Sequence, residues 1–163
     1  MSAAEARPLR PPRRRLARLA AVQALYQLDV AGGTPEAVIR EFREHRLGEL
    51  RRAVAGDGPV PAVDEDWFAM LVGGVWARRR ELDREIAPVL RTGWTPERLD
   101  VTLRALLRAA AFELIHRPEV PWRVVVGEYV ELAHVLLGGG EPAFANAALD
   151  RLARRLRTEE PTS

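Results

Sequence analysis

Apolar residues in this chain recur at intervals of three and four positions, and this spacing constrains the fold more than any other feature. Such a period places apolar side chains on one face of an α-helix, whereas a half-buried strand alternates apolar and polar residues at every second position. No stretch of the sequence alternates in that way. The sequence therefore predicts an all-α protein.

Glycine, proline and capping residues divide the chain into expected helices. Threonine caps free amides, proline suits a first turn, and glycine suits the left-handed position after a helix. These signals predict helices at about 13–31, 35–54, 64–88, 95–117, 121–137 and 141–157, with a long loop over 55–63. We expect two antiparallel helical clusters, 13–88 and 89–157, between a flexible basic arm at 1–12 and a polar tail at 158–163.

Charge is distributed unevenly along the chain. The first twenty residues hold six arginines and one acid, a net charge of +5, while the other 143 residues hold −3. A basic arm joined to a folded body is a common way to bind polyanions. All 25 cations are arginines, which bind phosphate bidentately, although a lysine-free composition also arises from nucleotide bias in a genome.

The first predicted helix can present some of these arginines together. Arg14 and Arg18 lie one turn apart, with Arg15 about 100° from Arg14, and the apolar residues cluster elsewhere on the helix. The rise over four residues, about 6 Å, is close to the phosphate spacing of an extended single strand. We expect arginines outward and apolar groups inward. Charge alone leaves RNA, DNA, an acidic protein partner and a solubilising role open.

Little in the sequence supports catalysis. Cysteine is absent, serine occurs only at Ser2 and Ser163, the three histidines lack metal-ligand spacing, and the glycines at 138–140 have no preceding strand and no following GK[ST]. We therefore expect no enzyme activity, no metal and no cofactor. Without cysteine, or an apolar run near the roughly 20 residues of a membrane span, we expect a soluble, cytoplasmic protein.

Four segments have a family likeness. They are RRRLARLAAVQALYQLDVAG at 13–32, LVGGVWARRRELDREIAPVL at 71–90, LLRAAAFELIHRPEVPWRVVVGEYVELAH at 106–134 and FANAALDRL at 144–152. In order and spacing they resemble the NusB family of bacterial transcription antitermination factors. The resemblance implies two three-helix subdomains that bind boxA RNA together with ribosomal protein NusE. It also implies action in the elongation complex, with RNA polymerase and other Nus factors, to promote read-through of ribosomal RNA operons.

The resemblance further implies particular site residues. RNA contacts fall to Arg13, Arg14, Arg15, Arg18, Phe144 and Asn146, and NusE contacts fall to Tyr26, Arg104, Arg108 and Glu113. A core position for Phe144 or Tyr26 stays open on the residues alone. The chain departs from the family at Leu103, where an acid is usual, at Gly127, where asparagine is favoured, and at Ala147, where glycine is favoured.

Two other readings remain at this point. One is the noncatalytic NusB-like domain of RNA cytosine methyltransferases, although such an enzyme needs a further α/β domain with a glycine-rich cofactor motif, which these 163 residues do not contain. The other is a helical adaptor for an acidic protein. Salt-dependent RNA binding would separate this adaptor from an RNA-binding factor, because phosphate contacts release counterions.

Overall fold

The computed structural model describes residues 13–157, so the predicted arm at 1–12 and tail at 158–163 lie outside the described residues. Helices make up most of the described chain, and no strand occurs in it, which confirms the all-α prediction. The α-helices are α2 (Arg13–Ala31), α3 (Pro35–Glu41), α4 (Leu47–Ala55), α5 (Glu65–Ala77), α6 (Arg79–Ile86), α7 (Val101–His116), α8 (Trp122–Leu136) and α9 (Glu141–Leu156). The shorter elements are the π-helix η1 (Phe42–Arg46) and the 3-10 helices η2 (Ala87–Val89) and η3 (Pro96–Arg98).

Some predicted boundaries are confirmed by the contacts that form them. The Thr34 hydroxyl accepts a hydrogen bond from the Ala37 amide at 3.2 Å, and Pro35 occupies the first turn of α3. Gly32 and Gly33, which follow α2, have φ angles of 79° and 98°. Only glycine adopts such angles readily, so these two residues turn the chain sharply between α2 and α3.

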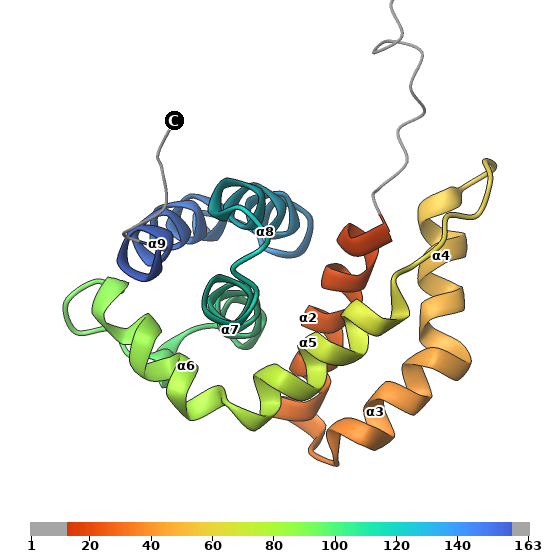
Figure 1. The fold of residues 1–163 in the computed structure, drawn as a ribbon, viewed down its shortest axis with the longest axis horizontal. Helices are drawn as coiled ribbons and strands as arrows, with labels where there is room; N and C mark the ends of the chain where they lie inside the picture. The colour runs from red at the N-terminus through yellow and green to blue at the C-terminus, as the bar shows by residue number, and fades with distance from the viewer. Residues whose placement is uncertain (1–12, 158–163) are drawn as a thin grey trace, which may run out of the picture.

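Two other predicted helices have different bounds. The signal at Thr95 opens only the η3 turn, because the Asp100 carboxylate accepts from the amides of Thr102 and Leu103 and thereby starts α7 at Val101. The helix expected over 64–88 is interrupted at Arg78, whose φ of −113° and ψ of 18° are not helical. The chain bends there, and α5 and α6 meet at a corner (Figure 1).

Helices α2 and α7 lie at the centre of the packing. Helix α2 packs against α5 and α7, while α8 and α9 pack against each other and against α7 (Figure 1). Helix α6 also packs on α7 through its buried Leu82 and Ile86, so it contacts residues beyond the expected subdomain boundary. The division into 13–88 and 89–157 stays a prediction. Among residues 13–157, no helix is long and apolar enough to cross a membrane.

An ion pair buried in the core links three helices. The Arg18 guanidinium of α2 donates to both carboxylate oxygens of Glu113 on α7, each at 2.8 Å. The Tyr129 hydroxyl of α8 donates to the same carboxylate at 2.6 Å. Arg18 is only 2% exposed, and Glu113 and Tyr129 are fully buried. The expectation that Arg18 faces outward is therefore wrong. Arg18 is buried, and the buried carboxylate of Glu113 neutralises its charge.

The electrostatics of this cluster favour the charged pair beside a neutral phenol. Burial by itself lowers the pKa of Arg18, but the hydrogen bonds and charge of Glu113 outweigh it, so that the pKa is raised overall. Burial, followed by the charge of Glu113, raises the pKa of Tyr129 well above its usual value. Tyr129 therefore remains a hydrogen-bond donor to the carboxylate.

Replacing Arg18 with methionine is expected to lower the free energy of unfolding by about 3–5 kcal/mol, because Glu113 would stay buried without a cation. Replacing all three polar partners, with Arg18→Met, Glu113→Leu and Tyr129→Phe, should restore much of that loss. Urea unfolding followed by circular dichroism measures both variants. If the free energy of unfolding of the Arg18→Met variant lay within about 1 kcal/mol of that of the parent, the result would contradict a buried, unpaired Glu113 charge in this variant.

Two adjacent glycines of α5 give a matched pair of substitutions. A Cβ at Gly74 would collide with the Phe112 ring of α7, whereas a Cβ at Gly73 meets nothing within 4 Å. We expect Gly74→Ala to cost about 1–3 kcal/mol by forcing α5 from α7, and Gly73→Ala to add about 0.5–1 kcal/mol through helix propensity. Thermal unfolding measures both. Equal effects would show that the close approach of Gly74 and Phe112 is not tight.

Candidate RNA and partner surfaces

Exposed cations gather where α2 begins. Arg13 and Arg14 are exposed there, and the Arg13 carbonyl accepts from the Asp64 amide, which places the start of α5 beside the start of α2. The Arg14 guanidinium lies 3.8 Å from the ring centroid of Trp67, and its Nε is 3.5 Å from the Asp64 carboxylate. Arg15 is half-buried and donates to Glu128 at 2.7 Å. Of the four predicted RNA-binding arginines, Arg13 and Arg14 thus have the most exposed side chains.

Trp67, a buried residue in the first turn of α5, organises this surface, although no motif in the sequence singles it out. The guanidinium carbons of Arg117 and Arg18 lie 5.5 and 5.7 Å from its ring, besides that of Arg14. Its indole Nε1 is buried and has no hydrogen-bond partner among the described residues. Stacking on an aromatic face holds a guanidinium in place while its N–H groups remain able to bind an anion.

A second surface surrounds Phe144, in the first turn of α9. Arg91, Trp94 and Arg98 come from the segment before α7 and line a pocket of about 530 Å³ with Phe144. The Trp94 and Phe144 rings are 6.0 Å apart at 44°, and the Arg91 guanidinium lies 6.0 Å from the Phe144 ring. Phe144 is half-buried and Trp94 is 46% exposed, so both rings line an open site. Asn146 is exposed two residues further along α9, about half a helical turn from Phe144.

The pocket around Phe144 also contains acids. Asp100 and Glu141 line it, and burial followed by the negative charge of Asp100 raises the pKa of Glu141. Leu103, at the position where the family usually has an acid, is buried and lines the same pocket. The pocket therefore combines two aromatic rings, two arginines and two carboxylates, which suits a flat polar ring such as a nucleobase.

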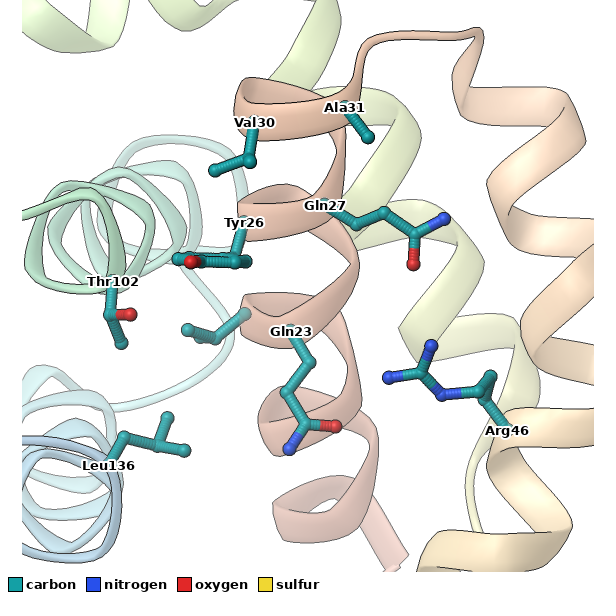
Figure 2. Close-up of a pocket in the computed structure, with 9 residues that line it drawn as sticks. Gln23, Tyr26, Gln27, Val30, Ala31, Arg46, Thr102 and Leu136 are labelled. Carbon is teal, nitrogen blue, oxygen red and sulfur yellow. The ribbon is translucent and has the colours of Figure 1, made fainter.

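A groove of about 440 Å³ runs along the outer side of α2 (Figure 2). Tyr26, which is 43% exposed, points from α2 toward Thr102 of α7, and Arg46 approaches from the opposite side (Figure 2). The other lining residues are mainly apolar or amide side chains: Val22, Gln23, Gln27, Val30, Ala31 and Leu136. This groove has the composition of a protein-binding surface, with an aromatic anchor and a mixed rim.

The other residues assigned to partner binding are engaged inside the protein. Arg108 is 8% exposed and binds Asp83 of α6 at 2.7 Å and Asp29 of α2 at 3.3 Å. Burial by itself lowers the pKa of Arg108. The hydrogen bond and the charge of Asp83 raise it by more, so the pKa is raised overall. Arg104 shares Asp29 at 3.3 Å and keeps 16% of its side chain exposed. The expectation that Glu113 contacts a partner is wrong, because Glu113 is fully buried.

The remaining departures from the family lie at the surface. Gly127 and Ala147 are both exposed, and a Cβ added at Gly127 would meet nothing within 4 Å. Neither residue therefore alters the packing of α8 or α9. In the part of the chain that the structure describes, no group of three or more metal-ligating side chains could hold a metal ion.

Known proteins are similar to this chain over most of its length. The sequence profile of the NusB family matches residues 15–154. Transcription antitermination protein NusB of Maricaulis maris is 49% identical over 148 residues, covering 90% of this chain and 89% of the relative. The protein of the same name from Caulobacter vibrioides is 50% identical over 144 residues, covering 88% of this chain and 94% of the relative.

Solved structures share the fold at lower identity. NusB of T. maritima superimposes with a TM-score of 0.64 at 24% identity, covering 90% of this chain and 93% of that one. A chain in the crystal structure of a plectonemic RNA supercoil gives 0.71 at 22%, covering 92% of this chain and 100% of that one. These two likenesses support the fold, and the sequence matches establish the kinship. The chain belongs to the NusB family, to which the transcription antitermination proteins of Maricaulis and Caulobacter also belong.

Proposed function

We propose that this protein is a noncatalytic RNA-binding transcription antitermination factor. It acts in the cytoplasm, binds boxA RNA together with ribosomal protein NusE, and promotes read-through of ribosomal RNA operons in a complex with RNA polymerase and other Nus factors. The observation that carries the RNA-binding part is the start of α2. There, exposed Arg13 lies beside Arg14, which is stacked on Trp67.

The arginines and the aromatic pocket have different roles in this proposal. Arg13 and Arg14 bind RNA phosphates, and Arg15 stays partly engaged with Glu128. Phosphate contacts attract any RNA, so they supply affinity without selecting a sequence. Selection falls to the pocket of Phe144 and Trp94, where stacking of one base typically contributes about 1–3 kcal/mol. Asn146, exposed two residues after Phe144 in α9, adds a side-chain amide that can pair with a base edge.

NusE binds the groove along α2 in this proposal. Tyr26 offers an exposed ring and hydroxyl in the groove. Tyrosine at the centre of an interface frequently contributes a large share of the binding energy. Arg104 and Arg108 act behind this surface, because their ion pairs with Asp29 fix the end of α2 against α7. Binding of NusE beside the RNA would raise the effective concentration of contacts, so NusE should tighten RNA binding.

The double substitution Arg13→Gln with Arg14→Gln should weaken binding to a boxA-containing RNA by roughly tenfold at moderate salt. Two lost phosphate contacts should also flatten the dependence of log K on log salt by about 1.4, at about 0.7 per contact. Fluorescence anisotropy over a salt series measures both quantities. The control is Arg40→Gln with Arg52→Gln, which removes the same charge from exposed positions on α3 and α4. Unchanged affinity and slope in the first variant would sink the RNA assignment of α2.

Replacing Tyr26 with alanine should weaken NusE binding by about 30-fold, equivalent to roughly 2 kcal/mol for a tyrosine hot spot. Affinity of the protein alone for boxA RNA should not change, because Tyr26 lies outside the RNA surfaces. Isothermal titration calorimetry measures NusE binding, with Val60→Ala, an exposed loop substitution, as the control. Equal NusE affinity for the Tyr26 variant and the parent would exclude this groove as the NusE site.

A further inference from the structure

The outer side of α6 carries positive charge that the folded protein leaves unneutralised. Arg78, Arg80 and Arg84 are exposed, and no ion pair or hydrogen bond to any of their side chains occurs among the described residues. Arg79 differs, since it stacks on Trp76 at 3.9 Å. Arg80 and Arg84 are four residues apart, so they lie on the same side of α6, about 6 Å apart along its axis.

Each acid of α6 contacts a side chain of a neighbouring helix and so offsets the exposed arginines only in part. Asp83 binds Arg108 of α7 at 2.7 Å, and Glu85 lies 3.3 Å from Arg155 of α9. Glu81 lies 3.7 Å from His116 of α7. The sequence of α6, RRELDREI, holds three arginines and three acids, and the acids contact side chains of α7 and α9. Asp83 is thereby largely withdrawn from solvent, while Glu81 and Glu85 keep 45% and 35% of their side chains exposed. The exposed Arg78, Arg80 and Arg84 therefore outnumber the accessible acids of α6.

The chain leads from this side of α6 directly to the aromatic pocket. Only the η2 turn and Leu90 separate the end of α6 from Arg91, which lies beside the Phe144 ring. The chain from Arg84 to Arg91 passes through the last residues of α6, the 3-10 turn η2 and two extended residues. The rise per residue of these three segments places Arg91 at most about 16 Å from Arg84. With the further 6 Å to Arg80, the row spans about three to four phosphates of an extended strand.

We propose that Arg80 and Arg84 bind the phosphate backbone of single-stranded RNA that continues beyond the Phe144 pocket. This inference rests on the proposed function, since the pocket must first hold an RNA base. The proposal adds a second backbone-binding row on α6, the helix that precedes the pocket-lining segment in the chain, whereas α7 follows that segment. RNA fits this row better than an acidic protein does, because regularly spaced phosphates match arginines 6 Å apart and because the row leads to two aromatic rings.

The test compares a boxA-length RNA with the same RNA extended by six uridines, on the 5′ side in one probe and on the 3′ side in another. The full chain should bind one extended RNA about five- to tenfold more tightly than the short RNA. Arg80→Gln with Arg84→Gln should remove this gain, lower the salt slope for that RNA by about 1.4, and leave the affinity for the short RNA unchanged. The matched control is Arg40→Gln with Arg52→Gln, which should retain the gain.

Each other result has a definite meaning. The inference fails if the Arg80 and Arg84 variant binds both extended RNAs as the parent does, or if the control loses as much affinity. It also fails if this variant instead loses affinity only for polyglutamate, which would indicate an acidic protein partner. No binding of the parent to the short RNA would contradict the proposed function itself. Circular dichroism of both variants checks that their helices are intact.

Discussion

The buried contact among Arg18, Glu113 and Tyr129 is the interaction on which the packing of the central helices depends. It joins α2, α7 and α8 at one carboxylate, from which water is excluded. Charges buried in this way stabilise a fold only when every partner is present, since an unpaired one has lost its hydration without compensation. The register of α2 against α7 is therefore specified by hydrogen-bond geometry as well as by apolar packing. The exposed Arg13 and Arg14 depend on this register, because they begin the helix that it holds.

Arginine serves the interior of this protein as much as its surface. Arg108 bridges Asp29 of α2 and Asp83 of α6, and Arg157 donates to the carbonyls of Leu114 and Val120 around the end of α7. A planar guanidinium suits both tasks, because its five donors can satisfy several acceptors at once. The charge of the sequence thus overstates the charge available to a ligand. What matters for binding is which arginines the fold leaves exposed.

The periodicity of apolar residues sufficed to predict the fold class and most helices, because it reports local geometry. It failed at two boundaries for different reasons. A competing local cap, Asp100, starts α7 in place of Thr95, and a tertiary contact accompanies the bend at Arg78, where α6 turns to pack on α7. The predicted site residues likewise fall into two groups, those that the fold leaves accessible and those that it buries. Tyr26 and Phe144 are accessible, whereas Arg18 and Glu113, 95 residues apart, bury each other. Trp67 and Trp94 were missed as surface-forming residues because their ring partners, Arg14 and Phe144, lie about 50 positions away.

The π-helix η1 changes the length of the helical segment between α3 and α4 without interrupting it. A π turn holds one more residue than an α turn, so Phe42–Arg46 behaves as a single-residue insertion between α3 and α4. The Phe42 ring stacks on Phe68 at 5.5 Å, and the extra residue is accommodated in a turn that brings Arg46 to the groove. With a regular α-helix at this position Arg46 would be rotated by about 100° from the groove, so the π turn determines which side chain of this segment lines the groove.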